Sequence, residues 1–334
     1  MLMNNVGIIS TGSYLPDRVM SNKEIEGFLD TSDEWIVEKT GIRNRHIAAP
    51  DQATSDLAVI AAERALKNAK LSASQIDLVV LATSTPDMIQ PSTACIVQGQ
   101  IGATNAGAFD LGAVCSGFVY ALAVAADMMK GNPLLNHVLV IGSEVYSRIL
   151  DWTDRSTAVF FGDGAGAVVL GRGETPGILG NYMGADGTKW DVIAMPGGGS
   201  RHPATHHTVL ANLHTFRMRG RDVWKFVMAK MPLAITTALE RSGKSMNELD
   251  FIIFHQANEV MLTALMDEMG LPLEKTYLNV GKNANTSGAS VPLALDEASR
   301  RGYLHAGDTL VLCGFGGGLA WSSLVLEWWG IDYE

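Results

Sequence analysis

Three residues at the ends of predicted elements carry the chemistry this sequence suggests, and Cys115 is the first of them. It lies between a predicted strand over 108–111 and a helix that begins near Cys115 and ends at Gly131. A thiol at a helix N-terminus feels unpaired N–H groups and the positive end of the dipole, which favour the nucleophilic thiolate. The plainer interpretation of Cys115 is a small buried core residue, which is common for free cysteine.

His255 and Asn285 are the other two. His255 opens the tetrapeptide His-Gln-Ala-Asn after the apolar run 251–254, and Asn285 opens Asn-Thr-Ser-Gly-Ala-Ser before a helix predicted from Ser287 to Arg301. Polar residues at strand ends lie where open α/β sheets bind ligands. A satisfied histidine and a turn asparagine are the plainer interpretations. Cysteine, histidine and asparagine together are nevertheless the set needed for acyl transfer through a thioester.

Other polar and glycine-rich segments give weaker signals. The run Gly316–Gly318 could offer a backbone N–H to an oxyanion, or could be a tight turn. The segment 162–166 does not have the GxGxxG spacing and leads into a strand, so we exclude dinucleotide binding. Four histidines lie in an irregular stretch without a partner pattern for a metal, and we predict no metal site: His202, His206, His207 and His214.

An internal duplication organises the chain. Ala65–Leu66 and the apolar run 76–81 recur 173 positions later as Ala238–Leu239 and 249–254. Two later pairs follow the same order, 137–142 with 308–314 and 162–170 with 316–326. The strands are continuous apolar runs, as in a sheet covered on both faces, and helices alternate with them. We therefore predict an α/β fold of two similar halves, 1–173 and 174–334, with an irregular insertion at 196–214. The duplication also makes the helices after Cys115 and Asn285 counterparts.

Composition narrows the class of protein. The 334 residues are 47% hydrophobic and 18% charged, which excludes a disordered tail protein. The 25 basic and 35 acidic residues give a net charge of −10, which argues against a nucleic-acid partner. Cys95, Cys115 and Cys313 are too few for a disulfide framework, and Cys95 and Cys313 fit core packing. Neither a signal peptide nor a membrane span is evident, so we expect a cytoplasmic protein.

Taken together, the motifs resemble the thiolase-like condensing enzymes, and most closely β-ketoacyl-acyl-carrier-protein synthase III. The resemblance covers nearly the whole chain. Its motifs are Thr-Ser-Asp-Glu-Trp-Ile (31–36), Thr-Gly-Ile-Arg (40–43), Cys-Ser-Gly-Phe (115–118), Phe-Gly-Asp-Gly-Ala-Gly (161–166), His-Gln-Ala-Asn (255–258), Asn-Thr-Ser (285–287) and Phe-Gly-Gly-Gly (315–318). It implies a five-layer αβαβα fold and a homodimer.

The resemblance also implies a mechanism. Cys115 takes an acyl group from a coenzyme A thioester, with the oxyanion held by the backbone N–H groups of Cys115 and Gly317. A malonyl thioester then loses CO₂, and His255 and Asn285 stabilise the enolate that attacks the acyl-enzyme. Two neutral hydrogen-bond donors suit an enolate because they stabilise it without quenching it. No cofactor is implied, since coenzyme A thioesters are substrates.

Further site residues follow from the same resemblance. Trp35 and Arg155 would sandwich the coenzyme A adenine, and Lys39 would lie near the phosphates. Asn258 would order water beside His255. Phe161 would line the substrate site, and Phe315 would pack behind it.

The sequence departs from the family pattern in two places. Family members carry bases where this chain has Val260, Asp267 and Glu268, and those bases are thought to receive the acidic acyl carrier protein. Carboxylates there should repel such a partner, so we hypothesise a preference for coenzyme A thioesters or a non-standard carrier. Family members often have an aromatic residue at the acyl pocket wall where this chain has Gln90, which indicates either a differently shaped or more polar pocket or a tolerated surface change.

Three alternative functions stay open at this stage. One is a related enzyme of specialised metabolism that uses coenzyme A thioesters for condensation or acyl transfer. A non-catalytic scaffold is disfavoured because Cys115, His255 and Asn285 are all present. A hydroxymethylglutaryl-type synthase would need a carboxylate base, for which Glu144 is the one candidate.

Overall fold

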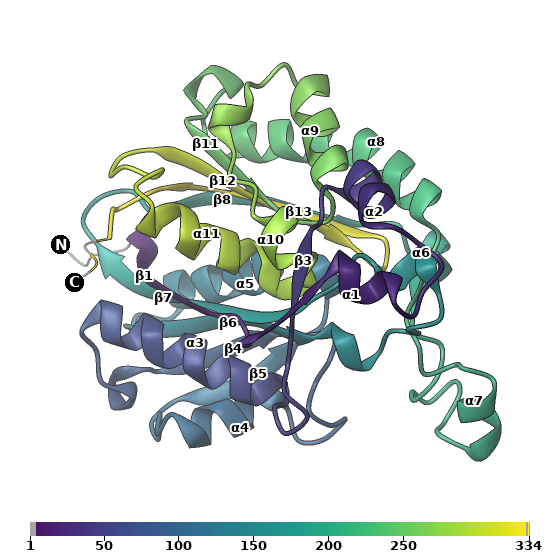
Figure 1. Cartoon of the computed structure of the whole chain (residues 1–334). Helices are drawn as coiled ribbons and strands as arrows, with labels where there is room; N and C mark the ends of the chain where they lie inside the picture. Colours follow the sequence, from purple (N-terminus) through teal and green to yellow (C-terminus); the bar gives the residue numbers. More distant parts are fainter. Residues whose placement is uncertain (1–4, 332, 334) are drawn as a thin grey trace.

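Two β-sheets stacked between helices form the body of the molecule. The computed structural model describes residues 5–331 and residue 333. The first sheet has the order β1-β7-β6-β4-β5 and the second the order β11-β12-β13-β8 (Figure 1). Their strands are β1 (Asn5–Tyr14), β4 (Leu78–Ala82), β5 (Gly107–Leu111), β6 (Val138–Val145) and β7 (Asp163–Gly173), then β8 (Ile178–Ala185), β11 (Phe251–Phe254), β12 (Thr309–Gly316) and β13 (Ala320–Glu327).

Helices fill three further layers. The middle layer is α5 (Gly117–Gly131) and α11 (Ser290–Arg300); the outer layers are α3 (Thr54–Ala69) with α4 (Thr93–Gln100), and α8 (Gly220–Arg241) with α9 (Glu259–Glu268). Each of the three main apolar clusters joins one helical layer to sheet residues. Along β4, Val80 packs into the middle layer whereas Val79 and Leu81 pack under α3. Both faces of the strand are therefore apolar, and the predicted αβαβα fold is confirmed.

The two sheets repeat one topology. In the first, β4 and β6 are parallel while β7 and β1 follow antiparallel; in the second, β11 and β12 are parallel while β13 and β8 follow antiparallel. The counterpart of β5 is reduced to a single bridge between Ile252 and Thr276. The first sheet uses only strands from 5–173 and the second only strands from 178–327.

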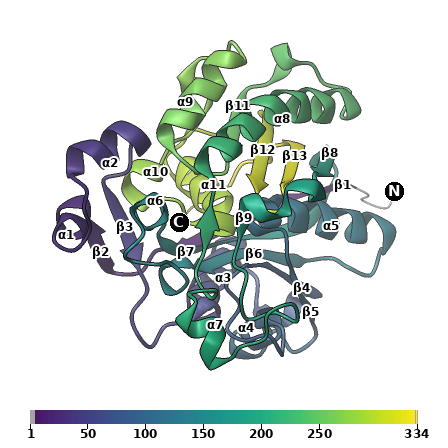
Figure 2. The ribbon, with the colours of Figure 1, turned by 90° about the vertical axis from the view of Figure 1, so that its right-hand side faces the viewer.

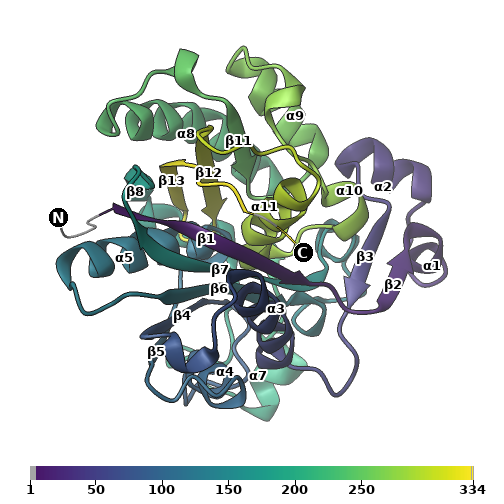
Figure 3. The same ribbon diagram turned by 90° about the vertical axis from the view of Figure 1, so that its left-hand side faces the viewer.

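The buried position of α5 between the two sheets accounts for its apolar sequence. The stretch 114–131 has the length and hydropathy of a membrane span, but most of it is buried. It packs between the two sheets, against both β4 and β12. Figure 3 shows β1 beside α11 and α3, which both contact it.

Shorter elements decorate this core. They are β2 (Arg18–Ser21), β3 (Asn44–Ile47), β9 (Ile193–Ala194), β10 (Arg217–Met218), α1 (Asn22–Glu26), α2 (Asp33–Thr40), α6 (Arg155–Ala158), α7 (His206–Leu210) and α10 (Val280–Asn283). The insertion predicted to be irregular contains α7, which projects from the body in Figure 1 and lies on the side that faces the viewer in Figure 2. Within the insertion His214 bonds to the Thr208 hydroxyl at 2.9 Å. Across the described residues, no three His, Cys, Asp or Glu side chains group as a metal site.

Candidate active site

The structure brings Cys115, His255 and Asn285 to one cavity of about 170 Å³. Cys115 lies in a 3₁₀ turn, Val114–Ser116, that leads into α5. His255 follows β11, and Asn285 precedes the corresponding 3₁₀ turn, Ser287–Ala289, before α11. The duplicated topology therefore delivers Cys115 and Asn285 to equivalent places on the two middle helices. Phe161 and Phe315 line the same cavity.

The resting Cys115 is a buried neutral thiol. Its side chain is 7% exposed, and its Sγ lies 3.3 Å from Ser287 Oγ. Burial raises the pKa of the thiol to about 12, and the nearby Glu144 carboxyl acts in the same direction. The expectation that the helix N-terminus favours a thiolate is wrong for the resting structure, because desolvation outweighs the backbone donors. The thiol proton has to leave during the reaction.

His255 is held as a neutral imidazole. It is 2% exposed, its Nδ1 lies 2.7 Å from Ser290 Oγ, and its ring meets Phe315 edge-on at 5.1 Å. Burial lowers its pKa to about 3. Because Nδ1 is occupied, Nε2 is the ring atom left for a substrate. The Ser290 oxygen also accepts the Gln256 N–H at 3.2 Å. A Ser290 hydroxyl that donates to Nδ1 leaves the ring N–H on Nε2, which is the tautomer that a donor role of Nε2 requires.

The lowered pKa of His255 predicts acid sensitivity. Between pH 6.5 and the folded pKa of about 3, His255 is protonated in the unfolded chain but not in the folded chain. The free energy of unfolding therefore decreases as the pH is lowered through this range. At pH 5 this loss amounts to about 2 kcal/mol relative to neutral pH. Urea unfolding at pH 7 and pH 5 should show a smaller loss in His255→Gln than in the native chain. His206→Gln, on exposed α7, should behave like the native chain. Equal losses in all three proteins would contradict the prediction.

Asn285 is oriented by its own turn. Its Oδ1 accepts the backbone N–H of Ser287 at 2.8 Å, and its backbone bridges to Phe161. The amide oxygen is thus used internally, and the NH₂ group remains available to the cavity. Neighbouring residues hold this geometry under strain, since Val114, Ala284 and Ser287 all have positive φ without being glycine.

The glycine run meets the nucleophile through Gly316. A Cβ on Gly316 would lie 2.8 Å from the Cys115 Cβ and 3.1 Å from its Sγ, so only glycine fits there. Gly317 is the next residue along this turn, and its oxyanion role stays a prediction. The sequence pattern pointed to the run but not to Gly316 as the residue in contact.

Trp35, Lys39 and Arg155 lie outside the cavity, whereas Asn258 is one of the residues that line it. The Arg155 guanidinium stands 5.0 Å from the centre of the Trp35 ring. An adenine between them would need roughly 7 Å, twice a van der Waals contact of about 3.5 Å, so the two side chains must separate for the sandwich to form. Lys39 is paired with Glu38 and exposed. Asn258 caps α9 by accepting the Met261 N–H at 3.0 Å, and it donates to the Lys39 carbonyl at 3.1 Å. This capping role was not anticipated; the ordering of water stays a prediction.

Gln90 does not belong to the cavity. It is exposed and absent from the residues that line the space around Cys115. Within one chain Gln90 therefore does not line the space around Cys115, which fits its interpretation as a surface residue, and a role of Gln90 in shaping the acyl pocket stays a prediction. The wall is instead aromatic: Tyr146 stacks on Phe161 with ring centres 4.8 Å apart, and Phe216 meets both rings edge-on.

Sequence reasoning missed Ser287 and the role of its neighbours. Ser287 was part of the Asn-Thr-Ser motif, but nothing in the motif said that its hydroxyl touches the nucleophile. Glu144 was considered only as a base for another reaction, and Tyr146 was not considered. These buried side chains come from segments far apart in the sequence, and the spacing of residues within one segment does not predict contacts between segments.

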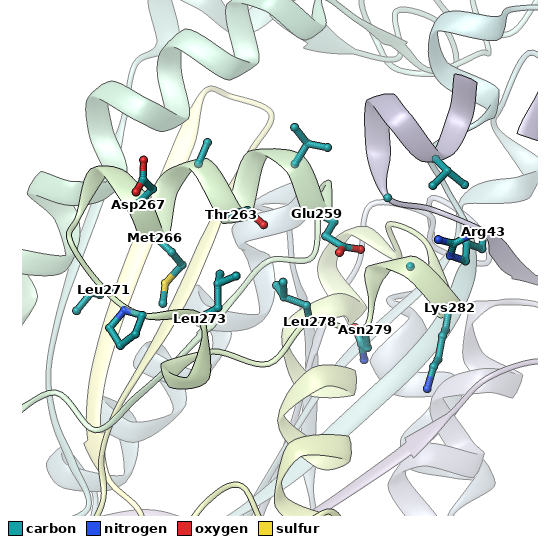
Figure 4. Close-up of a pocket in the computed structure, with 16 residues that line it drawn as sticks. Arg43, Glu259, Thr263, Met266, Asp267, Leu271, Leu273, Leu278, Asn279 and Lys282 are labelled. Atoms are coloured by element: carbon teal, nitrogen blue, oxygen red, sulfur yellow. The ribbon is translucent and has the colours of Figure 1, made fainter. Parts of the chain in front are cut away.

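A larger groove of about 960 Å³ lies elsewhere, between α2, α9 and α10. Figure 4 shows Glu259 and Asp267 on α9, with Arg43 and Lys282 across the groove. None of its lining residues is Cys115, His255 or Asn285. The smaller cavity is therefore the candidate active site, since it joins the nucleophile to its two partners.

Comparison with known proteins gives consistent matches. Residues 109–187 match the family model for 3-oxoacyl-[acyl-carrier-protein] synthase III, and residues 239–328 match the model for its C-terminal part. β-Ketoacyl-[acyl-carrier-protein] synthase III of Caldanaerobacter subterraneus subsp. tengcongensis is 50% identical over 96% of this chain and 97% of its own length. That of Clostridioides difficile is 49% identical over 96% and 98%.

Two solved structures extend the comparison. The 3-oxoacyl-[acyl-carrier-protein] synthase III of Aquifex aeolicus VF5 has a TM-score of 0.89 and 41% identity, covering 97% of this chain and 100% of that one. The priming β-ketosynthase of the R1128 polyketide biosynthetic pathway has a TM-score of 0.92 and 35% identity, covering 98% and 97%.

Proposed function

This chain belongs to the 3-oxoacyl-[acyl-carrier-protein] synthase III family, and from this premise we propose which residue performs each step of its reaction. The chain is an acyltransferase that starts fatty-acid synthesis. It condenses an acyl group from acyl-coenzyme A with a malonyl thioester, and CO₂ is lost. The one observation that carries the assignment of roles is the convergence of Cys115, His255 and Asn285 on a single cavity.

The first half-reaction loads the enzyme. The Cys115 sulfur attacks the thioester carbonyl, and the oxyanion accepts hydrogen bonds from the backbone N–H groups of Cys115 and Gly317. Gly316 supports this arrangement because its missing Cβ lets the turn approach the sulfur. Collapse of the intermediate expels coenzyme A and leaves an acyl-enzyme.

The second half-reaction forms the carbon–carbon bond. The malonyl thioester carbonyl receives hydrogen bonds from His255 Nε2 and the Asn285 NH₂ group, and the enolate formed by loss of CO₂ attacks the acyl-enzyme. The neutral state of His255 supports this role, because a neutral donor stabilises the enolate without protonating it.

The packing around the cavity favours a short primer. Phe161 and Phe216 line it, and Tyr146 stacks behind Phe161, so an acyl chain meets aromatic rings at once. Intact-protein mass spectrometry with acetyl-, butyryl- and octanoyl-coenzyme A should show the acetyl adduct forming fastest and the octanoyl adduct at least about tenfold more slowly. Phe216→Ala should narrow that ratio, and Phe28→Ala, outside the cavity, should not. Fastest loading by octanoyl-coenzyme A would overturn the assignment, and no adduct from any donor would overturn the nucleophilic role.

The carrier of the malonyl group is the second open point. Val260, Asp267 and Glu268 are exposed on α9, whose first turn adjoins the cavity at Asn258. Lys225 on α8 is also exposed, while Arg219 is neutralised by Asp191 and Asp222. This acidic face of α9 supports weak selection for an acidic carrier, as in a related enzyme of specialised metabolism.

We expect kcat/KM for malonyl-coenzyme A to lie within about tenfold of that for malonyl-acyl-carrier-protein. The double variant Val260→Arg, Asp267→Lys should raise kcat/KM for the carrier substrate alone, and the rise should shrink in high salt. Lys189→Arg, which conserves charge, is the control. A strong carrier preference in the native chain contradicts the hypothesis.

A homodimer and a cytoplasmic location complete the proposal. Beside Gln90, Met88 is 49% exposed and Ile89 is 80% exposed, which supports an interface between two copies. Light scattering on the purified chain decides between one copy and two.

A further inference from the structure

A path of buried hydroxyl contacts joins the Cys115 thiol to the carboxyl group of Glu144. Cys115 Sγ lies 3.3 Å from Ser287 Oγ, and Ser287 Oγ lies 3.3 Å from Glu144 Oε1. Both Ser287 and Glu144 are fully buried. The reacting sulfur is thus connected to a carboxyl group that does not itself line the cavity.

In each hydrogen bond that the structure gives Glu144, the carboxyl group is the acceptor. The donors are the hydroxyls of Thr83, Ser84, Thr85 and Ser287, and the backbone N–H groups of Ser84 and Gly288, at 2.7 to 3.3 Å. This set fits a carboxylate, which only accepts. Burial works against the charge and raises its pKa above the ordinary value. A carboxylate whose pKa is raised holds a proton more tightly than an ordinary one, and it is therefore suited to act as a base.

Local backbone geometry fixes Ser287 between the two groups. Ser287 has φ of 49°, in the left-handed region, and its N–H is bound by Asn285. The following glycine lets the carboxyl group approach, because a Cβ on Gly288 would make a tight contact of 3.0 Å with Glu144 Oε1. Strain of this kind persists where the surroundings hold a side chain in place for function.

We propose that Ser287 passes the Cys115 proton to Glu144 during acyl loading and returns it during condensation. The proposal rests on the proposed function, since it requires Cys115 to be the nucleophile. Ser287 touches the reacting sulfur, and Glu144 acts through Ser287.

The protons balance over both half-reactions. In loading, the Sγ–acyl bond forms and the acyl–coenzyme A bond breaks. The thiol proton goes to Ser287 Oγ, whose own proton goes to Glu144, and the departing coenzyme A thiolate takes a proton from water. In condensation, the enolate carbon bonds to the acyl carbon, the acyl–Sγ bond breaks, and Glu144 returns its proton through Ser287. One proton is consumed in total, as required when a malonyl carboxylate leaves as CO₂ and its electron pair forms the new bond.

Other titratable groups facing this network do not replace Glu144. Tyr146 lies 3.2 Å from Ser84 Oγ, and burial raises its pKa well above the ordinary value, so it stays protonated. His255 lines the substrate cavity and is reserved for the malonyl carbonyl. A purely electrostatic role for Glu144 makes the opposite prediction from a relay, because the negative charge alone disfavours the Cys115 thiolate.

The test measures single-turnover loading by acetyl-coenzyme A, with intact mass read at quenched times from pH 6 to pH 9. Glu144→Gln and Ser287→Ala should each load about a hundredfold more slowly. The loss of rate that the native chain shows toward acid pH should be absent in Glu144→Gln. Decarboxylation of malonyl-coenzyme A without a primer, which needs only His255 and Asn285, should be unchanged in both variants. Ser143→Ala removes an adjacent buried hydroxyl that binds the Thr54 carbonyl, and should load normally.

The outcomes separate the relay from its alternatives. Loading at the native rate or faster in Glu144→Gln overturns the relay in favour of a charge effect, and equal losses in loading and decarboxylation overturn it in favour of a structural role. If Glu144→Gln does not fold, Ser287→Ala decides alone by the same two rates. Absence of any adduct on the native chain is a different failure, since it removes Cys115 as the nucleophile.

Discussion

Replacing Cys115 by alanine is expected to abolish acyl loading, with a loss of at least about a thousandfold in the rate of adduct formation from acetyl-coenzyme A. The sulfur is the one group placed to form the covalent bond, between Gly316 on one side and Ser287 on the other. Decarboxylation of the malonyl thioester should survive, because His255 and Asn285 keep their own partners. The measurement pairs intact mass after incubation with CO₂ release.

Two other cysteines provide controls for this experiment. Cys313 is also buried, and burial raises its pKa to about 12 as it does for Cys115. Its sulfur lies 3.6 Å from Ser323 Oγ and does not reach the cavity. Cys313→Ala should therefore load normally, so location and not acidity distinguishes the nucleophile. Cys95 is exposed, and Cys95→Ala removes adducts from uncatalysed exchange. Persistent loading in Cys115→Ala would move the nucleophile elsewhere.

The fold was largely predictable because the two halves of the chain repeat the same order of helices and strands. The apolar runs 76–81 and 249–254 became β4 and β11, and the helices beginning near Cys115 and Ser287 became α5 and α11. Each apolar run alone is a weak prediction of a strand, but the same order of runs in both halves predicts the arrangement of the strands in two similar sheets. In the second sheet the counterpart of β5 is reduced to one bridge at Thr276. No sequence pattern predicted this difference, because the residues in place of the strand resemble those of an ordinary loop.

The site was predictable where side chains follow element ends and unpredictable where they meet from afar. Cys115, His255 and Asn285 each end or begin an element, so topology alone brings them together. The contact of Ser287 with both Cys115 and Glu144 joins segments more than 140 residues apart, and depends on left-handed backbone at Ser287. The acidity of Cys115 was misjudged for a similar reason, since burial is a property of the packed core and helix position is local.

Substitution of His255 or Asn285 is expected to separate the half-reactions in the opposite sense from Cys115→Ala. Asn285→Asp keeps the shape of the side chain but replaces the free NH₂ donor with a carboxylate oxygen facing the enolate. Condensation should fall by about a thousandfold, since a lost donor costs a factor of about 10² to 10³ and the added charge repels the enolate. His255→Ala should cost about a hundredfold or more. Acetyl loading should persist in both variants, because neither side chain is bonded to Sγ.

The variant Ser290→Ala tests whether the hydroxyl group of Ser290 positions His255 for condensation. Its hydroxyl holds His255 Nδ1 at 2.7 Å without lining the cavity, so its loss should lower condensation less than His255→Ala while leaving the malonyl KM nearly unchanged. If loading and condensation fall together in Asn285→Asp and His255→Ala, the division of labour is wrong, and the two side chains serve the nucleophile. If only condensation falls, one cavity performs two reactions with separate donors. The buried, neutral state of His255 should then also slow hydrolysis of the acyl-enzyme before the malonyl thioester arrives, since the residues described as lining the cavity include no charged acid or base.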